Sequence, residues 1–72
     1  MRLVSQDKET DIQYERALLY ISEGNEVAAM CNGEIWVMGI YETHKRAREV
    51  MREVQDVYYK YGSATIHTLP EK

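Results

Sequence analysis

The sequence has few of the residues that commonly hold a very small protein together. Its 72 residues include one cysteine, two histidines, one proline and no phenylalanine. A single cysteine cannot form an internal disulfide, and this set of cysteine and histidine does not have the spacing of a structural zinc site. We therefore expect a fold supported by neither a disulfide nor a metal, and we predict no cofactor.

The sequence also lacks a long apolar run. No stretch approaches the roughly 18 apolar residues of a membrane span, and residues 1–7 do not contain the apolar centre of a signal peptide. The single cysteine is in keeping with a reducing compartment. We expect a cytoplasmic protein that has no contact with a membrane.

The apolar content is enough for one small core. Hydrophobic residues make up 44% and charged residues 29% of the chain, which argues against disorder. A chain of this length buries only about 60% of the surface that its unfolded state exposes, so such domains often depend on a partner chain. We expect one α+β domain that spans residues 1–72.

The first 42 residues carry the signals of β-strands. Short apolar or alternating segments are separated by polar turns, and Asn32-Gly33 is the preferred pair for a two-residue type I′ hairpin turn. The expected strand segments are 3–4, 12–14, 17–21, 27–31 and 34–41. We predict a small antiparallel sheet of about four strands, built from hairpins.

Residues 43–61 change to the period of an amphipathic helix. Apolar residues recur at i, i+3, i+4 and i+7, at Ala47, Val50, Met51, Val54, Val57, Tyr58 and Tyr61. Thr43 is a favourable N-cap, and Gly62 stands where helices commonly end. The prediction is one long helix over about 43–61 that packs on the sheet, followed by a short tail or strand at 63–69.

The hairpin around Asn32-Gly33 is apolar on both faces. With these two residues in the turn, Ala29 pairs with Trp36, and each face is apolar along the strands. One helix covers one face, so the other is left for a second copy or another partner. We predict a homodimer or higher homo-oligomer; which face the helix covers stays open. One face carries Ala28, Met30, Ile35 and Val37. The predicted self-association residues are Val27, Ala29, Trp36, Met38 and Ile40.

One flank of the predicted helix is basic. Net charge is −5 over residues 1–42, from three basic and eight acidic residues, and +2 over residues 43–61, from five and three. This flank is suited to bind a nucleotide, a nucleic acid or an acidic protein surface. A solvated helix face that binds nothing is the alternative interpretation. The predicted binding residues are Lys45, Arg48, Arg52, Gln55 and Tyr59.

The sequence offers little for catalysis. Cys31 with His44 or His67 is the one nucleophile and base pairing available, but Cys31 adjoins a hairpin turn in an apolar strand without a nucleophile signature. The four glycines are scattered, so no glycine-rich phosphate loop exists. We expect a protein that is not an enzyme.

Two parts of the sequence resemble short proteins of Gram-positive bacteria and their phages. They are residues 1–7 with Asp11-Ile12 and Tyr14, and residues 38–43 leading into Ala47 and Val50-Met51. The resemblance covers about half of the chain, and its motifs are structural. Members usually carry a small residue and a proline around the first turn, where this chain has Lys8 and Gln13, so the first hairpin is expected to differ.

The resemblance implies a phage setting; most of these proteins have no assigned activity, and the company they keep in phage genomes suggests the function. Phages encode small non-catalytic proteins that block host defence by binding a defence protein or by sequestering its nucleotide signal, and some are homodimers, including short inhibitors of the Hachiman type. The first hypothesis is therefore a self-associating phage or prophage protein that binds a host protein in the host cytoplasm and inhibits a defence system. The alternative hypothesis is a sponge for a signalling nucleotide or nucleic acid that uses the basic helix flank.

Overall fold

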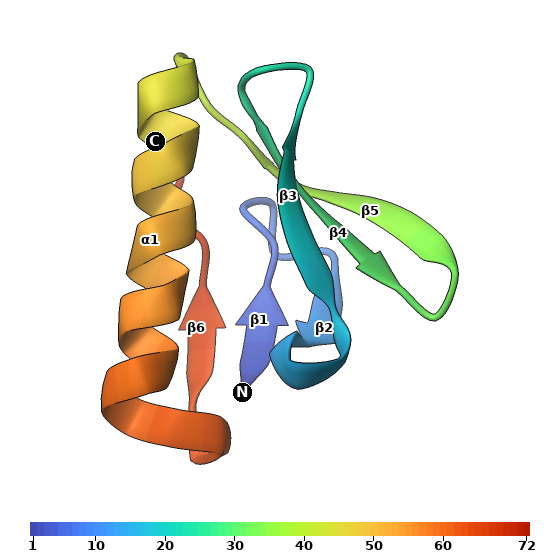
Figure 1. The fold of residues 1–72 in the computed structure, drawn as a ribbon, viewed down its shortest axis with the longest axis vertical. Coiled ribbons are helices and arrows are strands. Elements are labelled where there is room, and N and C mark those ends of the chain that lie inside the picture. Colours follow the sequence, from blue (N-terminus) through green and yellow to red (C-terminus); the bar gives the residue numbers. More distant parts are fainter.

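The computed structural model describes all of residues 1–72, and its strands form two sheets (Figure 1). In the first sheet, β1 (Arg2–Val4) lies between β2 (Asp11–Gln13), which is antiparallel to it, and β6 (Ile66–Thr68), which is parallel. The second sheet is antiparallel, with the order β3-β4-β5. Its strands are β3 (Leu18–Ser22), β4 (Glu26–Cys31) and β5 (Glu34–Ile40). The α+β class is confirmed, but the single sheet of about four strands is replaced by two sheets of three.

The division into two sheets begins directly after β2. A 3-10 turn, η1 (Tyr14–Arg16), redirects the chain before β3, so β3 does not extend the first hairpin. The free side of β1 is instead paired by the end of the chain. The Arg2 amide donates to the Thr65 carbonyl at 3.0 Å, and the Leu69 amide donates to the Val4 carbonyl at 2.9 Å. A parallel partner requires a long crossover, which the helix provides.

The helix α1 (His44–Tyr61) forms where its sequence signals predict it. The Thr43 hydroxyl oxygen accepts the Arg46 amide at 3.0 Å, which satisfies one of the free donors of the first turn. Gly62 ends the helix with a φ of 74°, and its amide donates to the Tyr58 carbonyl. A 3-10 turn, η2 (Gly62–Ala64), then leads into β6, beside which α1 runs (Figure 1). None of the helices has the length and hydrophobicity that crossing a bilayer requires.

One core joins the helix to the inner faces of both sheets. The helix contributes Ala47, Val50 and Val54, and the second sheet contributes Val27, Ala29 and Met38. The first sheet adds two residues that pair across β1 and β2, Leu3 and Ile12. Burying a side chain of this size stabilises the fold by about 1.5–3 kcal/mol. The remaining members of the core are Met1, Tyr41 and Leu69.

The β4–β5 hairpin follows the predicted register up to a bulge. Asn32 and Gly33 have φ values of 54° and 80°, as a type I′ turn requires. The pairs from Cys31–Glu34 to Ala28–Val37 are as predicted, but Val27 then pairs with Gly39, and Glu26 pairs with Ile40. The extra residue in β5 moves Ile40 to the face opposite that of Trp36. The prediction that Ile40 shares a face with Trp36 is therefore wrong.

Candidate binding surfaces

The outer face of the β3-β4-β5 sheet carries apolar side chains and faces away from the core. Strand pairing arranges them in cross-strand rows, because paired residues project to the same side. The first row is Leu18, Met30 and Ile35. The second is Tyr20, Ala28 and Val37. The third is Ser22, Glu26 and Ile40. No charged residue lies in the first two rows.

Much of this outer face is open to solvent. The exposed fractions are 61% for Leu18, 40% for Met30, 59% for Ile35, 49% for Val37 and 56% for Ile40. Single exposed apolar residues are normal, but a contiguous group in one sheet face is not. Neither the helix nor the first sheet covers it, since both pack on the inner face. This face is the main apolar surface that the fold leaves without a partner.

The outer face is not the face that the sequence analysis assigned to self-association. Val27, Ala29 and Met38 are at most 1% exposed and belong to the core, so a second copy could not contact them without opening the fold. The helix and the first sheet cover that side of the hairpin. Of the five predicted residues, only Trp36 and Ile40 reach the surface, and they do so on opposite faces.

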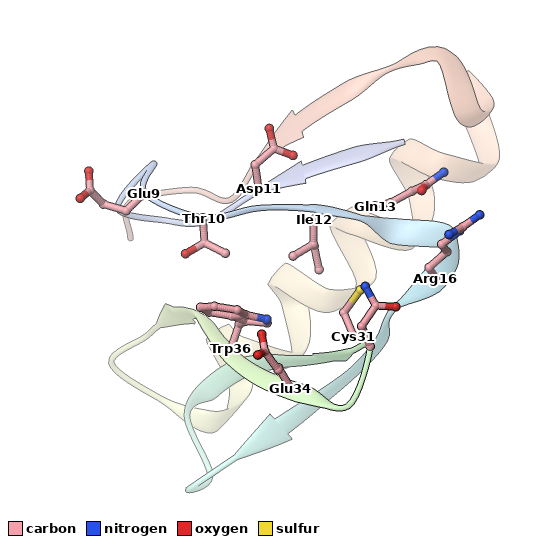
Figure 2. A pocket seen from close by; sticks show the side chains of 10 residues that line it. Glu9, Thr10, Asp11, Ile12, Gln13, Arg16, Cys31, Glu34 and Trp36 are labelled. Carbon is pink, nitrogen blue, oxygen red and sulfur yellow. The ribbon is translucent and has the colours of Figure 1, made fainter.

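A groove separates the two sheets on the side where β2 faces the β4–β5 hairpin (Figure 2). Its volume is about 460 Å³. Ile12 points into it from β2, and Trp36, which is 41% exposed, points into it from β5 (Figure 2). Its other lining residues are Glu9, Thr10, Asp11, Gln13, Arg16, Cys31, Asn32 and Glu34.

The basic helix flank is placed as predicted on the solvent side of α1. Lys45, Arg48 and Arg52 are exposed and border a shallow hollow of about 320 Å³ together with His44 and Glu49. None of the three cations forms an ion pair.

The rest of the predicted set is less closely grouped. Gln55 borders a different hollow, beside β3, and Tyr59 is exposed near the end of the helix. By contrast, Arg46 is held by Glu49 and Glu53. Its guanidinium also donates to the Lys72 carbonyl at 2.8 Å. Arg46 therefore has a structural role, and three free cations remain on the flank.

Ion pairs and hydrogen bonds shift the pKa values of several residues that lie outside the outer face and the helix flank. The Arg2 guanidinium binds Asp11 through two bonds of 2.6 and 3.1 Å and lowers the pKa of that carboxyl. The Ser5 hydroxyl donates to Asp7 at 2.6 Å and lowers the pKa of Asp7. Burial raises the pKa of Tyr41 to about 12. None of these groups belongs to the outer face or to the helix flank.

The residues considered for catalysis lie on separate parts of the fold. Cys31 is a free, half-buried thiol in the groove. His44 begins the helix, and its Nδ1 atom lies 2.6 Å from the Gly24 carbonyl oxygen in the β3–β4 turn. His67 lies on β6 opposite Leu3, with Nε2 buried. No cluster of three histidine, cysteine or acidic residues suited to a metal ion is present.

Sequence reasoning assigned self-association to the wrong face because the position of the helix decides between the two apolar faces, and it misplaced Ile40 because it missed the bulge. An isolated glycine inside a strand commonly marks a bulge, and Gly39 was that signal. The groove had no comparable local signal, since it depends on how the two sheets face one another. The outer face and the groove lie on opposite sides of the β3-β4-β5 sheet, so one does not obstruct the other.

Comparisons of this chain with models of protein families, with curated proteins and with solved structures find no match.

Proposed function

We propose that this chain is a non-catalytic binding protein that associates with a second copy of itself through the outer face of the β3-β4-β5 sheet. The observation that supports this most strongly is the pair of uncharged rows on that face. Leu18, Met30 and Ile35 form one row, and Val37 extends the apolar surface into the next. No element of the chain covers them.

The size of the outer face is close to what a dimer needs. At roughly 100 Å² for each half-exposed side chain, its five open residues offer on the order of 500 Å², near the upper end of patches that are often functional. That is about a tenth of the 4917 Å² surface of the chain, the share that a standard interface takes from a small protein. The strand backbones, Tyr20, Ser22 and Glu26 would enlarge the contact toward the ~800 Å² per partner of such interfaces.

A second copy suits this face better than a charged partner does. Two-fold symmetry places the same apolar rows opposite one another, so the contact needs no complementary charges. Two sheets packed in this way would stand about 10 Å apart, as in a β-sandwich. Glu26 is the one charged residue on the face and lies in its last row, away from the row of Met30.

Sedimentation of paired variants tests the association. The substitution Ile35→Lys places a charge in the first row without touching the core, because Ile35 is largely exposed. We expect the wild-type protein to dimerise with a dissociation constant on the order of micromolar, since association costs offset much of the apolar burial. Ile35→Lys should sediment as a monomer at every concentration tested.

Ile66→Lys is the matched control. Ile66 is also an exposed isoleucine in a strand, but it lies on the first sheet. This variant should dimerise like the wild type. A wild-type protein that stays monomeric at tens of micromolar, or a loss of the dimer in both variants, would argue against the proposed interface.

The biological setting that we propose is inhibition of a bacterial defence system by a phage or prophage protein that binds a host protein. It is supported by the resemblance of residues 1–7 and 38–43 to short proteins of Gram-positive bacteria and their phages. Phage plating on cells that carry a Hachiman system, with and without this protein, tests it. The proposal expects restored plating; unchanged plating would remove the Hachiman system as the target.

A second candidate function is the binding of a polyanion or a signalling nucleotide by the basic helix flank. Lys45, Arg48 and Arg52 are neighbours at spacings of three and four residues, where like charges destabilise a helix. Glu49 borders the same hollow but pairs with Arg46, so helix stability does not explain why the three cations stand together. A phosphate-bearing ligand would neutralise them.

Salt-dependent binding tests this second function. With three cations engaged, the affinity for a short DNA duplex should fall as salt rises, with a slope of about −3 in a log–log plot. The double variant Arg48→Ala/Arg52→Ala should lower both the affinity and the slope. Lys60→Ala/Lys72→Ala removes the same charge outside the flank and should change them less. Equal effects of the two double variants would contradict a specific role for the flank.

A further inference from the structure

The groove between the sheets combines an aromatic face with an unpaired carboxylate. Trp36 and Glu34 are two residues apart in β5, so their side chains project to the same side of the strand. Figure 2 shows both in the groove, with the Glu34 carboxylate beside the indole ring. Glu34 is exposed and forms no ion pair, and no side chain of the chain forms a cation–π or aromatic pair with Trp36.

The charges around this end of the groove are acidic. Glu9 stands beyond the Trp36 end, whereas Arg16, the one cation of the lining, lies at the other end (Figure 2). Asp11 points away from the groove and is bound by Arg2 on the far side of β2. Glu34 is therefore the unpaired carboxylate next to the exposed indole, and Glu9 adds negative charge beyond that end.

An apolar side chain, Ile12, also lines this part of the groove. Ile12 is 8% exposed and points from β2 toward the hairpin, beside the end of the groove that holds Trp36 and Glu34 (Figure 2). A ligand between Ile12 and Trp36 is partly shielded from water, which strengthens its interaction with the carboxylate. The Thr10 side chain, at the same end, adds a polar group to the wall.

We propose that this end of the groove binds a basic side chain, arginine or lysine, of a partner protein. The cation would stack on the indole of Trp36, as cations do on aromatic faces, and pair with the carboxylate of Glu34. The apolar stem of the same side chain would lie against Ile12. This site specifies which side chain of the partner is recognised. It rests on the function proposed above only because it requires that a partner exists.

The fluorescence of Trp36 reports binding at this site, because it is the only tryptophan. The probe is N-acetyl-argininamide, and its neutral isostere N-acetyl-citrullinamide is the matched ligand. We expect a saturable change with the arginine probe at ~1–10 mM, as befits a single side chain, and a much weaker response to citrulline. An equal response to both ligands, or no saturable response to arginine, would overturn the inference.

A variant of Glu34 distinguishes binding at this site from attraction of the probe by the net negative charge of the protein. Glu34→Gln should weaken the arginine probe about fivefold, the upper range for an exposed ion pair. Glu42→Gln removes the same charge outside the groove and should leave the affinity unchanged. If both variants lowered the affinity for the arginine probe equally, net charge alone would attract the probe, and a specific site at Glu34 would be contradicted.

One further measurement keeps the inference independent of the proposed dimer. Ile35→Lys should bind the probe as the wild type does, since the groove lies on the inner side of the sheet. Binding by a monomeric variant would support the groove even if self-association fails.

Discussion

The backbone of Gly39 lies directly against the aromatic ring of Tyr41. A β-carbon on residue 39 would stand 2.9 Å from Cε2 and 2.9 Å from the hydroxyl oxygen of Tyr41. The ring is buried, and its hydroxyl donates to the Pro70 carbonyl at 2.9 Å. The Arg46 guanidinium lies 6.0 Å from the ring centre. The bulge in β5 and the ring that ties it to the end of the chain thus form one unit.

Gly39→Ala should lower the free energy of unfolding by about 1–3 kcal/mol, the usual cost of overpacking. The φ angle of Gly39 is outside the left-handed region, so the contact with Tyr41 is the cause. Urea unfolding measures the change. In a Tyr41→Ala background, Gly39→Ala should cost clearly less, because the ring is gone. An equal cost in both backgrounds would argue against the contact.

The stability of the fold should decrease at high pH because of Tyr41. Burial raises its pKa from 10.0 to about 12, with Glu53 adding to the rise and Arg46 opposing it. The unfolded chain therefore loses this proton at lower pH than the folded chain does, and stability is lost as pH rises from 10 to 12. Urea midpoints at pH 9, 10 and 11 should fall less steeply in Tyr41→Phe. Equal slopes would contradict this role.

The stability of the fold at acidic pH depends on Asp7 and Asp11. Hydrogen bonds from Ser5 and from Arg2 lower their pKa values below the ordinary 3.8. A lowered pKa stabilises the fold above the ordinary value, and this contribution is lost as pH falls below about 4. Asp7→Asn/Asp11→Asn should be less stable at pH 7 and show a flatter decline in acid. Acid unfolding as steep as that of the wild type would contradict the assignment.

The local elements could be predicted from the sequence because their signals are local. Asn32-Gly33 determines a turn through the positive φ values that these two residues tolerate. Thr43 and Gly62 mark the ends of a helix whose apolar period is regular over several turns. The same period placed Lys45, Arg48 and Arg52 on one solvent-facing flank, so this candidate site was also predictable.

The arrangement of the sheets could not be predicted in the same way. The pairing of Leu3 with His67 joins the two ends of the chain, and no local pattern encodes it. Both faces of the hairpin are apolar, so only the position of the helix decides which of them is the inner face. The groove between Ile12 and Trp36 needs both sheets in place, so its residues share no sequence signal.

Replacing His67 by leucine should stabilise the fold. The Nε2 atom of His67 is buried and has no hydrogen-bond partner, and β6 holds the residue opposite the buried Leu3. A buried polar atom without a partner costs about 1–3 kcal/mol, so His67→Leu should raise the free energy of unfolding by about 1 kcal/mol. Thr68→Val, next to it and exposed, should change stability by less than about 0.5 kcal/mol. A destabilised His67→Leu protein would show that the imidazole makes a contact that leucine cannot replace.

Two adjacent alanines should differ in their response to enlargement, because their side chains lie on opposite faces of β4. Both are fully buried, but Ala29 belongs to the core and Ala28 lies in the outer-face row of Val37. Ala29→Leu forces a larger side chain against the helix and should lower the free energy of unfolding by about 1–3 kcal/mol. Ala28→Leu projects away from the core, so it should lower the stability of the monomer less than Ala29→Leu does, while the predicted dimer weakens. Urea unfolding in the Ile35→Lys background, which we expect to be monomeric, separates the two effects. A larger loss of stability from Ala28→Leu than from Ala29→Leu would mean that the inner and outer faces are the reverse of those described.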